Sequence, residues 1–97
     1  MSRQWTFLSS HGRVFEYIAG HKQNSVETMS LEIGNTQRAI FKIIKDLERD
    51  GYITRRKVGR NNQYEIHPDL PMRHHLDNGR PVREILSGIQ TEPQLGE

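Results

Sequence analysis

The sequence has no cysteine, few aromatic residues and no long apolar run. Without cysteine the chain cannot form a disulfide, use a thiol nucleophile or bind zinc through thiolates. No stretch approaches the ~20 apolar residues that span a bilayer, so we expect no membrane segment. Residues 1–5 lack the apolar core of a signal peptide, so we expect no export. These absences fit a cytoplasmic location, although a chain without cysteine fits any compartment.

The chain is also short of apolar side chains. Of its 97 residues, 33% are hydrophobic, which is enough for one compact core and leaves little for a second. We therefore expect a single domain over residues 1–90. Residues 91–97 are expected to form a disordered tail.

Excess charge of one sign is small overall but locally concentrated. The net charge is only +2, which is weak evidence for a nucleic-acid partner. Residues 1–35 are balanced and residues 68–97 are acidic, whereas residues 36–67 carry eight basic against four acidic side chains. The basic residues of that segment are Arg38, Lys42, Lys45, Arg49, Arg55, Arg56, Lys57 and Arg60. A positive electrostatic field therefore covers residues 36–67, the part of the chain that would contact phosphate groups if the protein bound a nucleic acid.

Residues 25–50 have the pattern of two helices joined by a tight turn. Ser25 is suited to cap the first helix, and Gly34 to end it, because glycine adopts the left-handed conformation at little steric cost. Either Asn35 or Thr36 caps the second helix. The apolar positions of the first helix are Val26, Met29 and Ile33. Those of the second recur with a period of 3.6 residues and are Ala39, Ile40, Ile43, Ile44 and Leu47.

A basic β-hairpin is expected directly after this helix pair, over residues 52–67. Tyr64 and Ile66 alternate with polar residues, as in a strand that is buried on one face. The expected parts are a strand at 52–57, a loop at 58–62 and a return strand at 63–66.

Two further helices complete the expected fold. The first is capped by Ser9 or Ser10, runs to Ala19, and follows an N-terminal arm or strand over residues 1–8. The last occupies residues 81–89, because Pro81 suits the first turn of a helix. The expected fold is mainly α with a small β-hairpin.

The order of these parts resembles a winged helix-turn-helix, with a three-helix core, a wing and a C-terminal helix. Ser30-Leu31-Glu32-Ile33-Gly34 places a small residue four positions before the turn glycine, as that motif does. The other motifs that carry the resemblance are Thr36–Ala39, Leu47–Ile53 and Val58–Ile66. The chain is thus similar to small winged-helix transcriptional regulators related to the MarR and ArsR groups. Asn35 departs from the pattern, because the family usually has an apolar turn residue there.

The resemblance implies a transcriptional regulator that binds double-stranded DNA sequence-specifically. Helix 36–50 would enter the major groove, and wing residues 55–62 would lie on the backbone or in the minor groove. The side chains expected to read bases are Gln37, Arg38 and Phe41. Those expected to contact the backbone are Thr36, Lys42, Lys45, Arg55, Lys57, Arg60 and Asn61. Glutamine suits adenine and arginine suits guanine, each good pair giving about 1–3 kcal/mol of base discrimination.

Phe41 and the wing each have an alternative interpretation. Phe41 either turns into the core, contacts a thymine methyl group, or packs on the first or second helix. Basic hairpins are often solvated edges in which lysine and arginine block aggregation. The alternative function is a winged-helix module for protein–protein or RNA interaction, without sequence-specific DNA binding.

A homodimer is expected from the habit of the family, whose members mostly bind paired half-sites about one DNA turn apart. The stripe expected at the dimer interface, which a lid over the core would also show, is Val82, Ile85, Leu86 and Ile89.

The five histidines do not have the spacing of a metal or catalytic site. The adjacent pair His74-His75 would diverge in a helix or strand rather than chelate one ion. We therefore expect no metal, no cofactor and no enzymatic activity. The sequence shows neither the operator nor whether a small-molecule effector exists.

Overall fold

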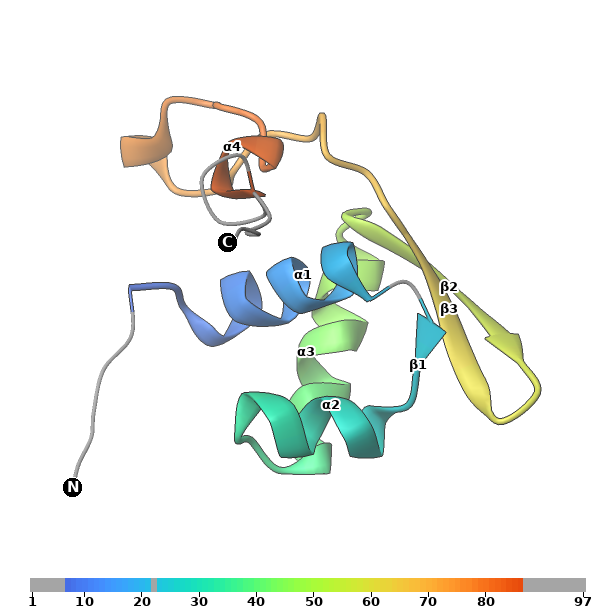
Figure 1. The fold of residues 1–97 in the computed structure, drawn as a ribbon. Helices are drawn as coiled ribbons and strands as arrows, with labels where there is room; N and C mark the ends of the chain where they lie inside the picture. Colours follow the sequence, from blue (N-terminus) through green and yellow to red (C-terminus); the bar gives the residue numbers. More distant parts are fainter. Residues whose placement is uncertain (1–6, 22, 87–97) are drawn as a thin grey trace, which may run out of the picture.

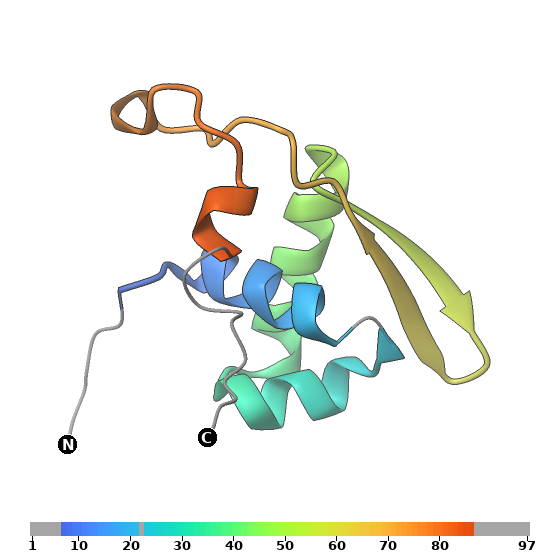
Figure 2. The same cartoon turned by 45° about the horizontal axis from the view of Figure 1, so that its top comes forward.

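The computed structural model describes residues 7–21 and 23–86, which form three main helices and a β-hairpin (Figure 1). The helices are α1 (Ser10–Gly20), α2 (Val26–Ile33) and α3 (Gln37–Arg49). The hairpin consists of β2 (Ile53–Val58) and β3 (Asn61–Ile66). In both views the hairpin lies to one side of the helices and projects beyond them (Figures 1 and 2).

Each of the three helices begins at a hydroxyl side chain that accepts a hydrogen bond from a backbone N–H. Ser9 accepts from Gly12 at 3.0 Å, and Ser25 accepts from Thr28 at 3.1 Å. Thr36 accepts from the N–H of Ala39 at 3.0 Å. These bonds satisfy donors that the first turn of a helix leaves without a partner. The predicted cap at Ser25 is confirmed, and of the two pairs of candidates Ser9 and Thr36 are the caps.

The turn between α2 and α3 depends on Gly34. Its φ of 92° is left-handed, and its N–H donates to the carbonyl of Ser30 at 2.9 Å. Glycine adopts this conformation without the clash that a Cβ would cause. Asn35 then lies half-buried between this glycine and the Thr36 cap.

The hairpin turn is tighter than the sequence indicated. β2 and β3 stay paired out to Val58↔Asn61, so the turn is Gly59-Arg60 alone. The predicted loop over residues 58–62 is therefore wrong. Gly59 has a φ of 61°, and two-residue hairpin turns need a positive φ at their first position.

A third strand, β1 (Gln23–Asn24), pairs with the free edge of β3, giving the sheet order β1-β3-β2. The sequence did not indicate a strand at this place. Two residues are too few to show the alternation by which a strand is recognised.

The core lies where α1, α2 and the base of the hairpin meet α3. Most of the predicted stripe of α3 is confirmed, since Ile40, Ile43, Ile44 and Leu47 are buried, whereas Ala39 is half-buried. The other helices contribute Val14, Phe15, Ile18 and Met29, and the hairpin region contributes Tyr52, Ile53 and Tyr64. Burial of these side chains fixes which face of α3 is left to solvent.

After β3 the chain folds back over the N-terminal half of α1 (Figure 2). It forms a 3₁₀ turn (His75–Asp77) and a short helix, α4 (Arg83–Leu86). Pro81 lies in a bridge with Pro71 rather than in the helix, so the predicted helix start at residue 81 is wrong. No helix within residues 7–21 and 23–86 is long and apolar enough to cross a membrane.

The stripe expected at a dimer interface is partly used within one chain. Val82 and Leu86 are buried in the core, and Ile85 is half-buried. Ile89 lies outside the described residues, as do most of the predicted N-terminal arm and the whole predicted tail over 91–97. In the described part, α4 therefore acts as a lid, and the homodimer stays a prediction.

We expect Gly34→Ala to lower the free energy of unfolding by about 1–2 kcal/mol, the cost of a left-handed conformation for a residue with a Cβ. Apart from its chain neighbours, an added Cβ would meet no atom within 4 Å, so strain in the local backbone alone would cause the loss. The matched control is Gly12→Ala in α1, where the added Cβ meets Ser9 Oγ at an ordinary 3.4 Å. It should raise stability by up to about 1 kcal/mol. Urea unfolding measures both, and effects of the same sign would contradict this account.

Candidate nucleic-acid interface

An open groove of about 790 Å³ runs between α3, the start of α2 and the hairpin. Its walls combine side chains that the sequence assigned to two separate elements. The predicted contact residues that line it are Gln37, Arg38, Phe41, Arg55, Lys57 and Arg60. The fold therefore brings the predicted base-reading residues and most of the predicted wing residues to one surface. Thr36, Lys42, Lys45 and Asn61 are exposed outside this groove lining.

The outward face of α3 carries a stripe of basic side chains along its whole length. Its members follow one another at intervals of four, three and four residues, which places them on one helix face. They are Arg38, Lys42, Lys45 and Arg49, and all four are exposed. Arg49 was not among the predicted contacts, although the same spacing would have identified it. The stripe lies opposite the buried apolar stripe, so it is presented by the packing of the core.

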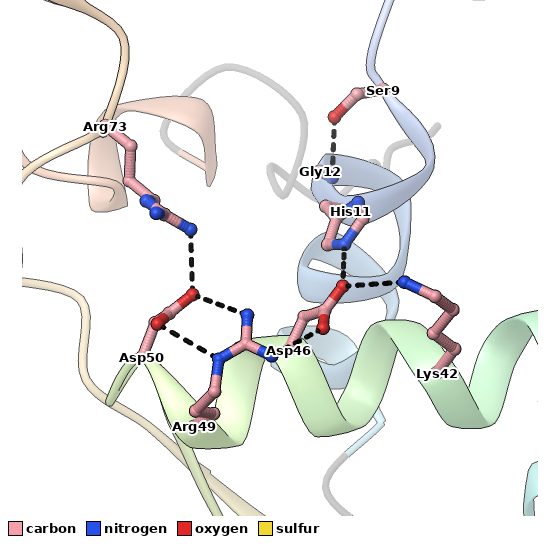
Figure 3. A network of polar contacts seen from close by, with 8 residues as sticks. All are labelled: Ser9, His11, Gly12, Lys42, Asp46, Arg49, Asp50 and Arg73. Atoms are coloured by element: carbon pink, nitrogen blue, oxygen red, sulfur yellow. Dashed lines mark hydrogen bonds and ion pairs between the residues drawn. The ribbon is translucent and has the colours of Figure 1, made fainter.

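Two carboxylates in the C-terminal half of α3 pair with Lys42 and Arg49 of this stripe (Figure 3). Asp46 lies 3.1 Å from Arg49, 3.7 Å from Lys42, and 2.8 Å from Nε2 of His11 on α1. Asp50 lies 3.3 Å from Arg49 and 2.7 Å from Arg73. These contacts tie α3 to α1 and to the segment after the hairpin, and they offset part of the positive charge at that end.

The pKa of Asp46 is lowered, chiefly by its hydrogen bond to His11 and further by the charges of Lys42, Arg49 and His11. Burial acts in the opposite direction and is the second-largest effect, after the hydrogen bond to His11. Asp46 is therefore ionised through the neutral range. The pKa of Arg49 is raised, chiefly by its hydrogen bond to Asp50. Both pKa shifts favour the charged form, so the ion pairs of this network stabilise ionised Asp46 and protonated Arg49.

Phe41 lies at the surface of α3, with 41% of the residue exposed. The interpretation that placed it in the core is wrong. Lys45 Nζ is 5.2 Å and Arg55 Cζ is 5.6 Å from the centroid of its ring. Both lie within the range of a cation–π interaction. The ring thus joins α3 to β2 as part of the groove wall.

The basic residues of the hairpin face different ways, as strand alternation requires. Arg55 and Lys57 point into the groove, whereas Arg56 lies on the opposite face. Arg60 is exposed in the turn and Asn61 directly follows it. Arg55 differs from the others because it pairs with Glu48 of α3 at 3.5 Å, and only 25% of its side chain is exposed. Across the strands it faces Tyr64, whose pKa is raised chiefly by burial.

The other histidines also make contacts within the protein. His67 Nε2 lies 2.7 Å from Thr54 Oγ1, across the base of the hairpin. His74 and His75 stack with their ring centroids 4.5 Å apart. Within residues 7–21 and 23–86, no group of three or more histidine, aspartate or glutamate side chains could hold a metal ion.

We expect His11→Ala to raise the pKa of Asp46 toward its ordinary value, because the hydrogen bond from His11 is the main cause of the shift. NMR titration of the carboxyl carbon measures this, and His21→Ala, which removes a ring stacked on Tyr17, is the control. A carboxyl whose pKa is depressed in the folded state stabilises the fold above its unfolded pKa of about 3.9. That stability is lost as the pH falls through the folded value, so His11→Ala should also flatten acid destabilisation below about pH 4. An unchanged pKa of Asp46 would contradict the assignment.

No protein-family model matches the chain, and no curated protein is similar enough to count as a match.

Proposed function

We propose that this protein is a transcriptional regulator of the winged helix-turn-helix type that binds double-stranded DNA sequence-specifically. The observation that carries the proposal is the basic stripe along α3 beside a groove whose far wall is a basic hairpin. An α-helix with its side chains is about 10–12 Å wide and the major groove of B-DNA is about 12 Å wide. Such a helix, flanked by a projecting hairpin, can therefore enter one groove while the hairpin reaches the adjacent backbone.

The N-terminal end of α3 is suited to read bases. It has no acidic residue in its first turn, and Gln37 and Arg38 lie there at the mouth of the groove. Each can form a bidentate pair with a base edge, Gln37 with adenine and Arg38 with guanine. Phe41, one turn further along, offers an apolar contact to a thymine methyl group.

The remaining charges are suited to hold phosphates. Thr36 lies at the helix N-terminus, where the dipole and the free N–H groups favour an anion. The proposed backbone contacts are Thr36, Lys42, Lys45, Lys57, Arg60 and Asn61. We propose Arg49 as a further one, because it is exposed on the same face of α3. Arg60 lies in the two-residue turn. It would contact the phosphates, or the minor groove that adjoins the major groove occupied by α3. Two copies on paired half-sites would complete the complex.

The alternative is a protein- or RNA-binding module with a solvated basic face. A-form RNA has a deep, narrow major groove that side chains cannot read, so a reading helix favours DNA. The exposed face of α3 is mostly charged, and Phe41 is its large apolar residue. A protein interface with that composition would lack the apolar centre that such interfaces usually have.

A salt titration of duplex binding tests the proposal. We expect affinity for a mixed duplex to fall steeply as salt rises, because phosphate contacts release counterions, with a log–log slope of about −4 for four to five contacts in each copy. Fluorescence anisotropy with duplex DNA and with duplex RNA of the same length measures this. Absence of DNA binding at low salt, or equal preference for RNA, would overturn the proposal.

Replacing two arginines by alanine should change DNA binding in two different ways, one affecting base preference and the other overall affinity. Arg38→Ala should relax base preference at one position by about 1–3 kcal/mol. Arg60→Ala should weaken binding to all sequences alike and reduce the salt slope by about one. Arg80→Ala is the control, since Arg80 pairs with Glu84 in the segment after the hairpin. Selection from a random duplex library, followed by Kd measurements, separates the outcomes. Equal losses with unchanged preference would mean that α3 is not the reading helix.

A further inference from the structure

Arg55 occupies the point where the hairpin leaves the body of the protein. Its Nη2 lies 3.5 Å from Oε1 of Glu48, and its Cζ lies 5.6 Å from the ring centroid of Phe41. Only 25% of the Arg55 side chain is exposed. The lysine and arginine side chains in the other ion pairs of the described residues are 37–78% exposed. Arg55 is therefore the most covered cation among them, and it is covered by α3.

Beyond Arg55 the hairpin has no support from α3. Ile53 and Tyr64 are buried at its base, whereas Arg56 through Asn61 are all exposed. β1 pairs with β3 at Gln63 and Asn62, so the two-stranded part of the hairpin is its outer end from Val58 to Asn61. Two-stranded ribbons are marginally stable alone, and their twist varies widely. From Arg55 to Gly59 the strand spans about 13 Å, so a change of about 20° at its base would move the tip by about 5 Å. That displacement approaches the minor-groove width of about 6 Å, so the tip needs a fixed base to find its target.

Glu48 also needs a partner if DNA approaches this groove. Its carboxylate is among the groove-lining groups, and it would repel a phosphate backbone if it were left without a cation. Arg55 supplies that cation from β2. Moving Arg55 to a phosphate would leave the carboxylate uncompensated beside the polyanion. The charge on Arg55 therefore compensates the carboxylate of Glu48 within the protein.

We propose that Arg55 is a positioning residue, not a DNA contact, and that its contacts with Glu48 and Phe41 hold the hairpin at the angle that lets α3 and the hairpin tip engage one duplex. This inference rests on the proposed DNA binding. It removes Arg55 from the predicted backbone contacts and gives Glu48, an acidic residue in a basic groove, a role in binding. Lys57, two residues further along the same face of β2, lies among the groove-lining residues without such a partner in the described structure.

Neutral substitutions with salt titrations test this proposal. Arg55→Gln and Glu48→Gln should each lower affinity about three- to tenfold, the range that coupling between contacting residues implies, with an unchanged salt slope. The double variant should bind no more weakly than either single variant. Lys57→Gln, the matched control, should reduce the slope by about one. If Arg55 instead binds phosphate, Arg55→Gln will reduce the slope and Glu48→Gln will strengthen binding.

A second measurement needs no DNA. The ¹⁵N order parameter of the Gly59 amide, at the tip, should fall in Arg55→Gln and Glu48→Gln and stay unchanged in Lys57→Gln. Arg55→Lys keeps the charge but loses the planar guanidinium, so it should restore only part of the order and affinity, and it serves if Arg55→Gln does not fold. Unchanged tip order in both neutral variants would overturn the proposal. Absence of DNA binding by the unmodified protein would overturn the proposed function instead, while the NMR result still reports on the hairpin.

Discussion

Burial of one face of α3 is the constraint on which the rest of the structure depends. Ile40 and Ile44 are completely buried, and Ile43 and Leu47 nearly so, against side chains from α1, α2 and the hairpin base. Since the helix repeats every 3.6 residues, burying that stripe leaves the opposite stripe in solvent. The exposed stripe is the one that carries Arg38, Lys42, Lys45 and Arg49. The core and the proposed DNA-binding surface are therefore two faces of the same helix.

The surface of α3 can serve as the proposed interface only because other elements are held against it. His11 on α1 and Arg73 after the hairpin bind carboxylates at its C-terminal half (Figure 3), and Arg55 of β2 binds Glu48. Single exposed ion pairs contribute little stability, about 0–1 kcal/mol each. Their effect here is on geometry, since each joins α3 to a different segment. Among the proposed base and backbone contacts, the cations that have no carboxylate partner in the described residues are Arg38, Lys45, Lys57 and Arg60.

The helices and their caps were predictable because their signals are local. Ser25, Gly34 and the apolar stripe of α3 act over three or four residues, and the structure confirms all three. The choice of Thr36 over Asn35 as a cap was open, because both side chains can accept the same kind of bond. The predicted loop of the hairpin, residues 58–62, was too long, because the sequence does not show that Val58 and Asn61 pair across the strands. Arg49 was not predicted as a contact, although the four-three-four spacing of the basic residues continues to it at the C-terminal end of α3.

The amino-acid pattern predicted the three main helices, the buried stripe of α3 and the excess of positive charge over residues 36–67, because periodicity and composition are properties of neighbouring residues. The pairing of β1 with β3, the contact of His11 with Asp46 across 35 residues, and the contact of Arg55 with Glu48 became evident only in the folded chain. It also placed Phe41 at the surface. These contacts join segments whose relative position follows from packing of the whole core, and no local pattern encodes them.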